Sequence, residues 1–98
     1  MKMVKIALIT GGTRGIGAAI SSSLKTSGHT VIANYASNDE SAQNFSNETG
    51  IEVMKWDVSN YEETTSCISE IYKKHSSIDI LVNNAGITQD APLHKMTI

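Results

Sequence analysis

Four short apolar runs, separated by stretches with helical spacing, most constrain what this chain folds into. The runs cover residues 4–10, 30–35, 51–56 and 78–83 and are rich in Val, Ile and Leu. Short runs that contain β-branched residues are typical of strands. The first and fourth runs contain consecutive apolar residues without alternation, a pattern of strands that are covered on both faces. The alternation of strand and helix predicts an α/β protein with a parallel sheet.

Three segments with helical periodicity lie between the runs. Residues 37–39 and 59–60 supply start signals for the second and third segments, and Gly28 and Gly50 end the first and second. The predicted apolar stripes are Ile16, Ala19, Ile20 and Leu24; Ala42, Phe45 and Thr49; and Thr64, Cys67, Ile68, Ile71, Tyr72 and His75. Each crossover between parallel strands is expected to be right-handed.

Composition excludes several classes of function. Eight Lys and Arg against ten Asp and Glu give a net charge of −2, so there is no basic excess to attract nucleic acid or an anionic membrane. The single Cys67 excludes an internal disulfide and is typical of a reducing cytoplasm. The three histidines are too scattered for a metal site. No apolar run approaches the roughly 20 residues that span a bilayer. We therefore expect a cytoplasmic protein with one domain over residues 1–98 and no metal.

A glycine-rich turn joins the first predicted strand to the first predicted helix. Residues 10–17 read TGGTRGIG. Gly11 permits a sharp turn, Gly15 lets the backbone approach a pyrophosphate, and Gly17 permits close helix–strand packing. The helix start offers its free N–H groups to the phosphates. An ordinary turn is the alternative, but the strand–turn–helix setting favours dinucleotide binding, and the lack of a following Gly-Lys-Ser/Thr excludes a P-loop. The candidate binding residues here are Gly11, Gly12, Thr13, Arg14, Gly15, Ile16 and Gly17.

The end of the second predicted strand indicates which dinucleotide is bound. Residues 34–37 read Asn-Tyr-Ala-Ser, without the acid that binds the ribose 2′-OH of NAD. Ser37 and Asn38 can donate hydrogen bonds to a 2′-phosphate, and Arg14 can add a charge-assisted contact. These residues favour NADP(H), whereas Asp39 and Glu40 favour NAD if the strand ends later. The binding candidates in this segment are Asn34, Tyr35 and Ser37.

Two more polar segments follow the third and fourth predicted strands. Asp57-Val58 follows the third strand, and Asn83-Asn84-Ala85-Gly86 follows the fourth. The carboxyl ends of parallel strands lie at one edge of the sheet, where open α/β sheets bind ligands. Both segments are therefore candidate binding segments, with an ordinary strand-end turn as the alternative.

The three motifs together resemble the short-chain dehydrogenase/reductase family. They are TGGTRGIG at 10–17, Asp57-Val58, and NNAG at 83–86, and the resemblance covers the whole chain. The stretch NNAGITQDAPLHKMT is most similar to the branch of acetoacetyl-CoA reductases and 3-oxoacyl-acyl-carrier-protein reductases, in which Gln89 is usually Arg. The resemblance implies a Rossmann-type three-layer fold with strand order 3-2-1-4. It also implies NADPH-dependent hydride transfer to the ketone of a 3-oxoacyl thioester, and homo-oligomeric complete relatives.

The resemblance also implies a role for each motif. The glycines at positions 11, 15 and 17 cradle the pyrophosphate, and Arg14 binds the 2′-phosphate. Asp57 hydrogen-bonds the adenine amino group, and Val58 donates to the adenine through its backbone. The residues that line the nicotinamide ribose are Asn83, Ala85 and Gly86.

The catalytic residues of this family have no counterpart in the chain. They are a Ser, a Tyr and a Lys four residues after the Tyr, whereas Tyr35, Tyr61 and Tyr72 are followed at that distance by Asp, Thr and Ser. The serines at 21–23 lie inside the first predicted helix. We expect the catalytic residues beyond Ile98, so that the chain is the first half of the fold, inactive alone, with an apolar edge at 78–83. The alternatives are a non-catalytic dinucleotide-binding or split-enzyme module that needs a carboxyl-terminal half chain, and a non-functional gene remnant.

Overall fold

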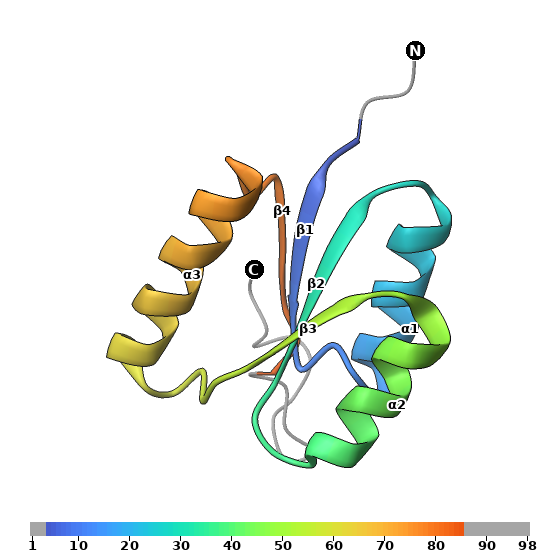
Figure 1. Cartoon of the computed structure of the whole chain (residues 1–98), viewed down its shortest axis with the longest axis horizontal. Helices are drawn as coiled ribbons and strands as arrows, with labels where there is room; N and C mark the ends of the chain where they lie inside the picture. Colours follow the sequence, from blue (N-terminus) through green and yellow to red (C-terminus); the bar gives the residue numbers. More distant parts are fainter. Residues whose placement is uncertain (1–3, 86–98) are drawn as a thin grey trace, which may run out of the picture.

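The computed structural model describes residues 4–85, which form a parallel four-stranded sheet with helices on both faces (Figure 1). The elements are β1 (Ile6–Thr10), α1 (Gly15–Thr26), β2 (Thr30–Tyr35), α2 (Asp39–Thr49), β3 (Glu52–Lys55), α3 (Tyr61–His75) and β4 (Ile80–Asn83). The strands lie in the order β3-β2-β1-β4, and every neighbouring pair is parallel. The predicted Rossmann-type α/β fold and its strand order 3-2-1-4 are confirmed.

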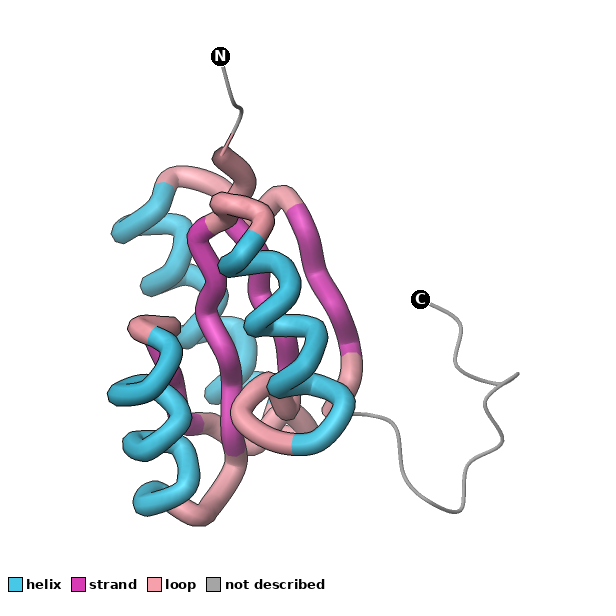
Figure 2. The backbone as a smooth tube through the Cα atoms, turned by 90° about the vertical axis from the view of Figure 1, so that its right-hand side faces the viewer, coloured by secondary structure: helices cyan, strands magenta, loops and turns pink. Residues whose placement is uncertain are grey.

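Alternating strand residues form two apolar cores, one on each face of the sheet. In β1, Ala7 and Ile9 face the layer of α1 and α2, whereas Leu8 between them faces α3. All three are buried, and burial of an aliphatic side chain such as Leu or Ile stabilises the fold by about 1.5–3 kcal/mol. Figure 1 shows the sheet nearly edge-on between α3 and the pair α1 and α2, and Figure 2 shows the strands side by side with helices in front of and behind them. The two cores hold the four strands in one sheet.

Side-chain caps determine where the second and third helices begin. The Oδ1 atom of Asn38 accepts from the Ser41 N–H at 3.1 Å, and that of Asn60 accepts from the Glu63 N–H at 3.0 Å. Asn60 is the N-cap of α3, because Ser59 is bonded to Asp57 instead. Gly50 ends α2 with a φ of +75°, in the left-handed region that glycine adopts without strain.

The buried face of α1 matches the predicted apolar stripe only in part. Ile16 is 67% exposed, and the fully enclosed positions are Gly17 and Ser21. Small residues are needed on this face, because a Cβ on Gly17 would overlap the carbonyl of Gly11. The Ser21 hydroxyl uses the same close approach to donate to the Gly12 carbonyl at 3.0 Å. Of the predicted stripe, Ile20 and Leu24 pack against the core as expected, whereas Ile16 and Ala19 are exposed.

Three strands are shorter than the apolar runs that predicted them. At the amino end of β1, the Lys5 N–H donates to Nδ1 of His29 and the Ile6 N–H donates to the carboxylate of Asp79. Side chains thus replace ladder hydrogen bonds there, and β1 begins at Ile6. Before β3, the Ile51 N–H donates to the Thr49 hydroxyl, which ties this residue to the end of α2.

Within residues 4–85 the edge strand β4 is covered on one face only, which corrects the prediction from its apolar run. Ile80 and Val82 pack on the side of α1 and α2. Leu81 pairs in register with the buried Leu8 but is itself 53% exposed. Covering a strand on both faces needs neighbours that the local sequence of that strand does not specify.

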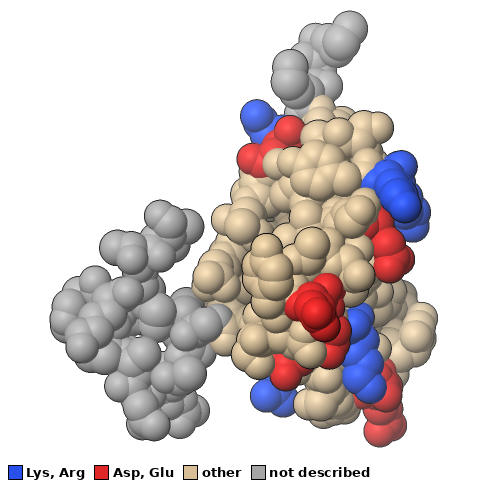
Figure 3. Space-filling view, turned by 90° about the vertical axis from the view of Figure 1, so that its left-hand side faces the viewer, with Lys and Arg blue, Asp and Glu red and all other residues tan. Residues whose placement is uncertain are grey.

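The face that carries α3 holds charges of both signs close together (Figure 3). Lys74 and His75 near the end of α3 both contact Oε1 of Glu52 on β3, at 3.2 and 3.4 Å.

Among residues 4–85 no helix is long and apolar enough to cross a membrane.

We predict that Ser21→Ala destabilises the fold and that Ser23→Ala does not. Loss of the Ser21 hydroxyl leaves the buried Gly12 carbonyl without this donor, which costs about 1–3 kcal/mol. Ser23 is exposed in the same helix, so its substitution changes the free energy of unfolding by less than about 0.5 kcal/mol. Urea unfolding followed by the emission of the buried Trp56 measures both. Equal stability of the two variants would contradict the assigned role of Ser21.

Candidate functional site

The carboxyl ends of the four strands meet at one edge of the sheet, at the bottom of Figure 1. The loops that leave this edge enclose a groove of about 700 Å³. The groove is lined by Gly11, Thr13, Arg14, Gly15, Ile16, Asn34, Tyr35, Ala36, Ser37, Asn38, Ser41, Trp56, Asp57, Val58, Ser59, Asn84 and Ala85. Most of the residues selected from the sequence are therefore brought together, although they come from four separate segments.

The glycines of the turn have different structural roles. Gly15 has a φ of +60°, and a Cβ placed on it has no atom within 4 Å, so this position lines the groove without a side chain. Gly17 is buried beneath the groove, where it permits contact of α1 with the Gly11 carbonyl. Gly12 is also buried, between Ser21 and the strands, and lies outside the lining. The bare helix start at Gly15 is a shape that accommodates a phosphate group.

Asn34 connects the glycine turn to the ends of two strands. It is 1% exposed, its Oδ1 accepts from the Gly11 N–H at 3.1 Å, and its Nδ2 donates to the Trp56 carbonyl at 3.0 Å. Its backbone carbonyl accepts from the Gly12 N–H at 2.9 Å. The amide that the sequence marked as a binding candidate is thus occupied by the protein itself. It holds the floor of the groove in place.

Asn84 holds the glycine turn from the opposite side, and it is the one residue of the candidate segment 83–86 to which the sequence assigned no individual role. Its Nδ2 donates to the Gly11 carbonyl at 3.0 Å. The neighbouring Asn83 lies outside the groove lining, and its Oδ1 accepts from the Thr10 hydroxyl at 3.3 Å. The Thr10 hydroxyl oxygen also accepts from the Ala85 N–H at 3.0 Å. The paired asparagines at the end of β4 were the available signal, but sequence alone does not show which of the two amides bonds the glycine turn and which bonds Thr10 of β1.

Gly86, the last binding candidate of this segment, lies outside the described residues.

Asp57 is an ionised acceptor on the β3 side of the groove. Its Oδ1 accepts from the Ser59 hydroxyl at 2.7 Å and from the Ser59 N–H at 2.9 Å. These two bonds hold the pKa of the exposed Asp57 carboxyl below its ordinary value, and the bond from the Ser59 hydroxyl has the larger effect. The Asp57 N–H donates to Oε1 of Glu63, which fixes the loop that precedes α3. A carboxylate held in this way is suited to accept a hydrogen bond from an amino group.

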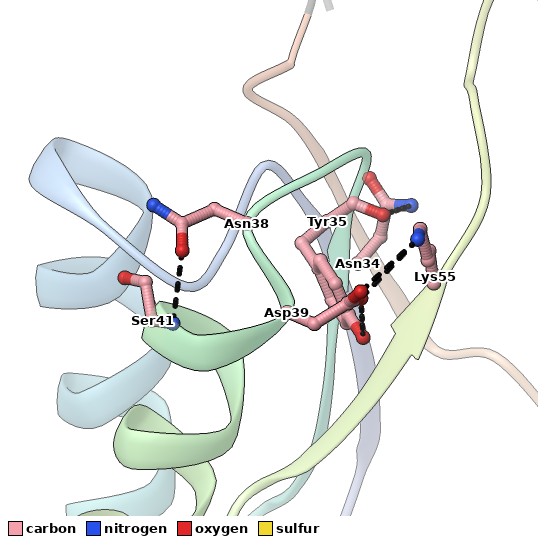
Figure 4. Close-up of polar contacts among 6 residues, drawn as sticks. All are labelled: Asn34, Tyr35, Asn38, Asp39, Ser41 and Lys55. Atoms are coloured by element: carbon pink, nitrogen blue, oxygen red, sulfur yellow. Dashed lines mark hydrogen bonds and ion pairs between the residues drawn. The ribbon is translucent and has the colours of Figure 1, made fainter.

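The acid nearest the end of β2 is turned toward β3 (Figure 4). The strand ends at Tyr35, and neither Asp39 nor Glu40 lines the groove. Asp39 instead pairs with Lys55 at 3.2 Å and accepts from the Tyr35 hydroxyl at 3.0 Å. The pKa of Asp39 is lowered, mainly by its hydrogen bond to Lys55 and to a smaller extent by the one from Tyr35. The pKa of Tyr35 is raised, mainly by burial and to a smaller extent by the neighbouring Asp39. The condition under which these acids favoured NAD, a strand that ends later, is not met.

Arg14 is the cation of the groove lining. It precedes α1 in an extended conformation and is exposed. Among residues 4–85 it forms no ion pair, and no group of three His, Cys, Asp or Glu residues there is placed to hold a metal ion. Within the described chain the guanidinium is therefore available for an anionic ligand.

The profile of the short chain dehydrogenase family matches residues 5–98. The chain belongs to this family. It is 55% identical over 95 residues to an acetoacetyl-CoA reductase of Paracoccus denitrificans, covering 97% of this chain and 39% of that protein. It is 40% identical over 101 residues to the 3-oxoacyl-[acyl-carrier-protein] reductase FabG of Staphylococcus aureus strain Mu50, covering 98% and 41% respectively. The chain thus spans about two fifths of the length of these curated relatives.

Solved structures show the same architecture. A betaketoacyl-[ACP] reductase from Bacteroides thetaiotaomicron superimposes with a TM-score of 0.78 at 27% identity, covering 90% of this chain and 43% of that one. A short chain dehydrogenase from Bacillus anthracis superimposes with a TM-score of 0.79 at 26% identity, covering 96% and 41%. The four-stranded unit of this chain is therefore a common part of larger dehydrogenase structures.

We predict that Ser59→Ala raises the pKa of Asp57 toward its ordinary value of 3.8, because the variant removes the stronger of the two donors. A lowered folded-state pKa stabilises the fold above the unfolded-state pKa, and this stabilisation is lost as the pH falls through the folded-state pKa. The variant should therefore lose less stability than the wild type on acidification below 3.8. Carbon NMR titration of the Asp57 carboxyl measures the shift, with Ser66→Ala on the exposed side of α3 as the control. An unchanged Asp57 titration in Ser59→Ala would refute the assignment.

Proposed function

We propose that this groove binds NADPH and that the chain is the cofactor-binding part of an acetoacetyl-CoA-type 3-oxoacyl-thioester reductase. The bare start of α1 at Gly15, open to the groove, is the observation that carries the proposal. Helix starts of this kind bind phosphate through free N–H groups and the helix dipole. The 55% identity to an acetoacetyl-CoA reductase supports the substrate class. NADPH supplies a hydride for transfer to a ketone when it is bound.

The proposed binding mode uses each part of the groove for one part of the cofactor. The backbone from Gly11 to Gly17 holds the pyrophosphate, and the side chains of Thr13 and Ile16 flank it. Asp57 accepts from the adenine amino group, and the Val58 backbone donates to the same ring. Asn83, Ala85 and Gly86 remain the proposed contacts of the nicotinamide ribose. Asn34 and Asn84 keep the turn in the conformation that this binding requires.

The preference for NADPH over NADH rests on the charge distribution beside Arg14. Ser37, Asn38 and Ser41 line the same groove and present neutral polar groups. The nearest acid along the chain, Asp39, is paired with Lys55 and lies outside the lining. A 2′-phosphate is negatively charged, so a hydrogen bond from an unpaired guanidinium strengthens its binding. A ribose hydroxyl is neutral, so its binding is strengthened much less.

We further propose that residues 1–98 are the amino-terminal part of one NADP(H)-binding domain and that this part alone has no turnover. No Tyr in the chain is followed by Lys at the fourth position, the spacing that the family resemblance requires for catalysis. The chain spans only 39% of the acetoacetyl-CoA reductase that it resembles. We also propose that the protein acts in the cytoplasm and that complete relatives form homo-oligomers.

A non-catalytic or split-enzyme module is the second candidate function. The observation in its favour is the edge strand β4, on which Leu81 is 53% exposed. A strand from a separate carboxyl-terminal half chain can extend a sheet at such an edge through main-chain hydrogen bonds. NADPH binding is expected from both candidates, and only the split module requires a second polypeptide for turnover.

We predict that the wild type binds NADPH more tightly than NADH and that Arg14→Ala removes most of this difference. Loss of a charge-assisted contact worth about 1.5–3 kcal/mol lowers NADPH affinity by roughly tenfold to a hundredfold and leaves NADH affinity nearly unchanged. Titration followed by energy transfer from Trp56, which lines the groove, measures both affinities. Lys25→Ala, in the last turn of α1, is the control for loss of a positive charge. A folded wild type without NADPH affinity would overturn the cofactor assignment.

We also predict that the purified chain does not oxidise NADPH steadily in the presence of acetoacetyl-CoA. The physical reason is the lack of a Tyr–Lys pair to deliver a proton to the developing alkoxide. Absorbance of NADPH measures the rate, and a chain heated to unfolding gives the background. Turnover above that background, at a rate proportional to protein concentration, would show that the chain is catalytic by itself.

A further inference from the structure

The side chains of Asn38 and Asp39 point in opposite directions at the start of α2 (Figure 4). Asn38 lines the groove, has a left-handed φ of +61°, and bonds the Ser41 N–H with its side chain. Asp39 points to β3, where Nζ of Lys55 lies 3.2 Å from Oδ1 and 3.3 Å from Oδ2. The Tyr35 hydroxyl is a second donor to the same carboxylate, at 3.0 Å. The carboxylate of Asp39 is thus held against β3, outside the groove, although the preceding residue Asn38 lines the groove.

This ion pair has little importance for the stability of the fold. The side chains of Lys55 and Asp39 are 52% and 68% exposed, and ion pairs between exposed side chains stabilise proteins only slightly. The pair does determine where a negative charge lies. The pKa of Asp39 is lowered, chiefly by its bond to Lys55, so the carboxylate is ionised near neutral pH. Its position therefore matters to any anion bound beside Asn38.

An acid at the end of the second strand is the feature by which this type of site selects a ribose hydroxyl over a 2′-phosphate. The groove lining around Asn38 contains Ser37, Asn38 and Ser41, which are all uncharged. If Asp39 lost its partner on β3, rotation of its side chain would bring a carboxylate toward this neutral lining. The repulsion of a 2′-phosphate would then increase, while a ribose hydroxyl would be unaffected or favoured.

We propose that Lys55 is a positioning residue for cofactor selection, which holds the Asp39 carboxylate against β3 and so keeps this one negative charge away from the 2′-phosphate of NADPH. The inference rests on the proposed binding of NADPH in the groove. It adds a residue outside the groove lining that maintains the preference for this cofactor. Tyr35 assists by donating to the same carboxylate. Lys55 acts through Asp39 and does not touch the cofactor.

The test compares NADPH and NADH affinities of the purified chain and its variants by titration. In Lys55→Met, NADPH affinity falls by about threefold to tenfold, while NADH affinity stays the same or rises. Lys55→Arg retains the wild-type preference, because it preserves a cation that pairs with a carboxylate. In the double variant Lys55→Met with Asp39→Asn the preference returns, because the misplaced charge is gone. At about 1 M salt, where the Debye length is about 3 Å, the effect of Lys55→Met on NADPH largely disappears.

Lys74→Met is the matched control. It removes the same charge from another exposed ion pair between a lysine and β3, the pair with Glu52, and leaves the cofactor preference unchanged. Three results would overturn the inference. Lys55→Met could keep the wild-type preference, it could lose affinity for NADPH and NADH equally, or the double variant could bind NADPH as weakly as Lys55→Met does. The last result would show that Lys55 acts directly on the phosphate. If Lys55→Met does not fold, Lys55→Gln alone and combined with Asp39→Asn gives the same comparison, because without the acid the residue at position 55 has no effect on preference.

The failure of this inference is distinguishable from failure of the proposed function. A wild type that binds NADPH, together with any of the three contrary results, overturns only the role of Lys55. A folded wild type that binds neither cofactor overturns both.

Discussion

The groove depends on one buried amide. Asn34 accepts from the first N–H of the glycine turn and donates to the carbonyl at the end of β3, so three chain segments meet on a single side chain. At 1% exposure water cannot replace either bond, and each unsatisfied buried group would cost about 1–3 kcal/mol. Asn84 bonds the carbonyl of the same turn from β4. The turn is therefore held between the ends of its two neighbouring strands.

This arrangement separates the parts of the protein that hold the site from the parts that face a ligand. Gly12, Gly17 and Ser21 are buried away from the groove, where Gly17 and Ser21 bring α1 close to the turn. Gly15 stands above them with no side chain over the groove. Mutations in the buried group therefore affect the fold first and binding second. Mutation of Arg14, which is exposed on the groove lining, should affect binding more than the stability of the fold.

The charges around the groove follow the same separation. Asp57 is kept ionised on the β3 side by its bonds to Ser59, where a carboxylate can accept from an amino group. Asp39 is ionised too, but Lys55 holds it outside the lining. The positive charge of Arg14 is thus not cancelled by a paired acid among residues 4–85. The groove carries an acceptor and a cation at separate positions, as a ligand with an amino group and a phosphate requires.

The sequence by itself determined the element order, the parallel sheet and the edge at which the site lies, because short β-branched runs and glycine turns act locally. The strand order of the sheet was predicted from the family resemblance, and the structure confirms it. Only the tertiary structure decided that Gly17 and Ser21 are the most buried positions of α1, which amides hold the turn, and where the charge of Asp39 points. Ile16 is exposed and Leu81 is half exposed despite their apolar character. The reason is physical: burial and side-chain direction depend on what packs opposite a residue, and residues distant in sequence supply that partner.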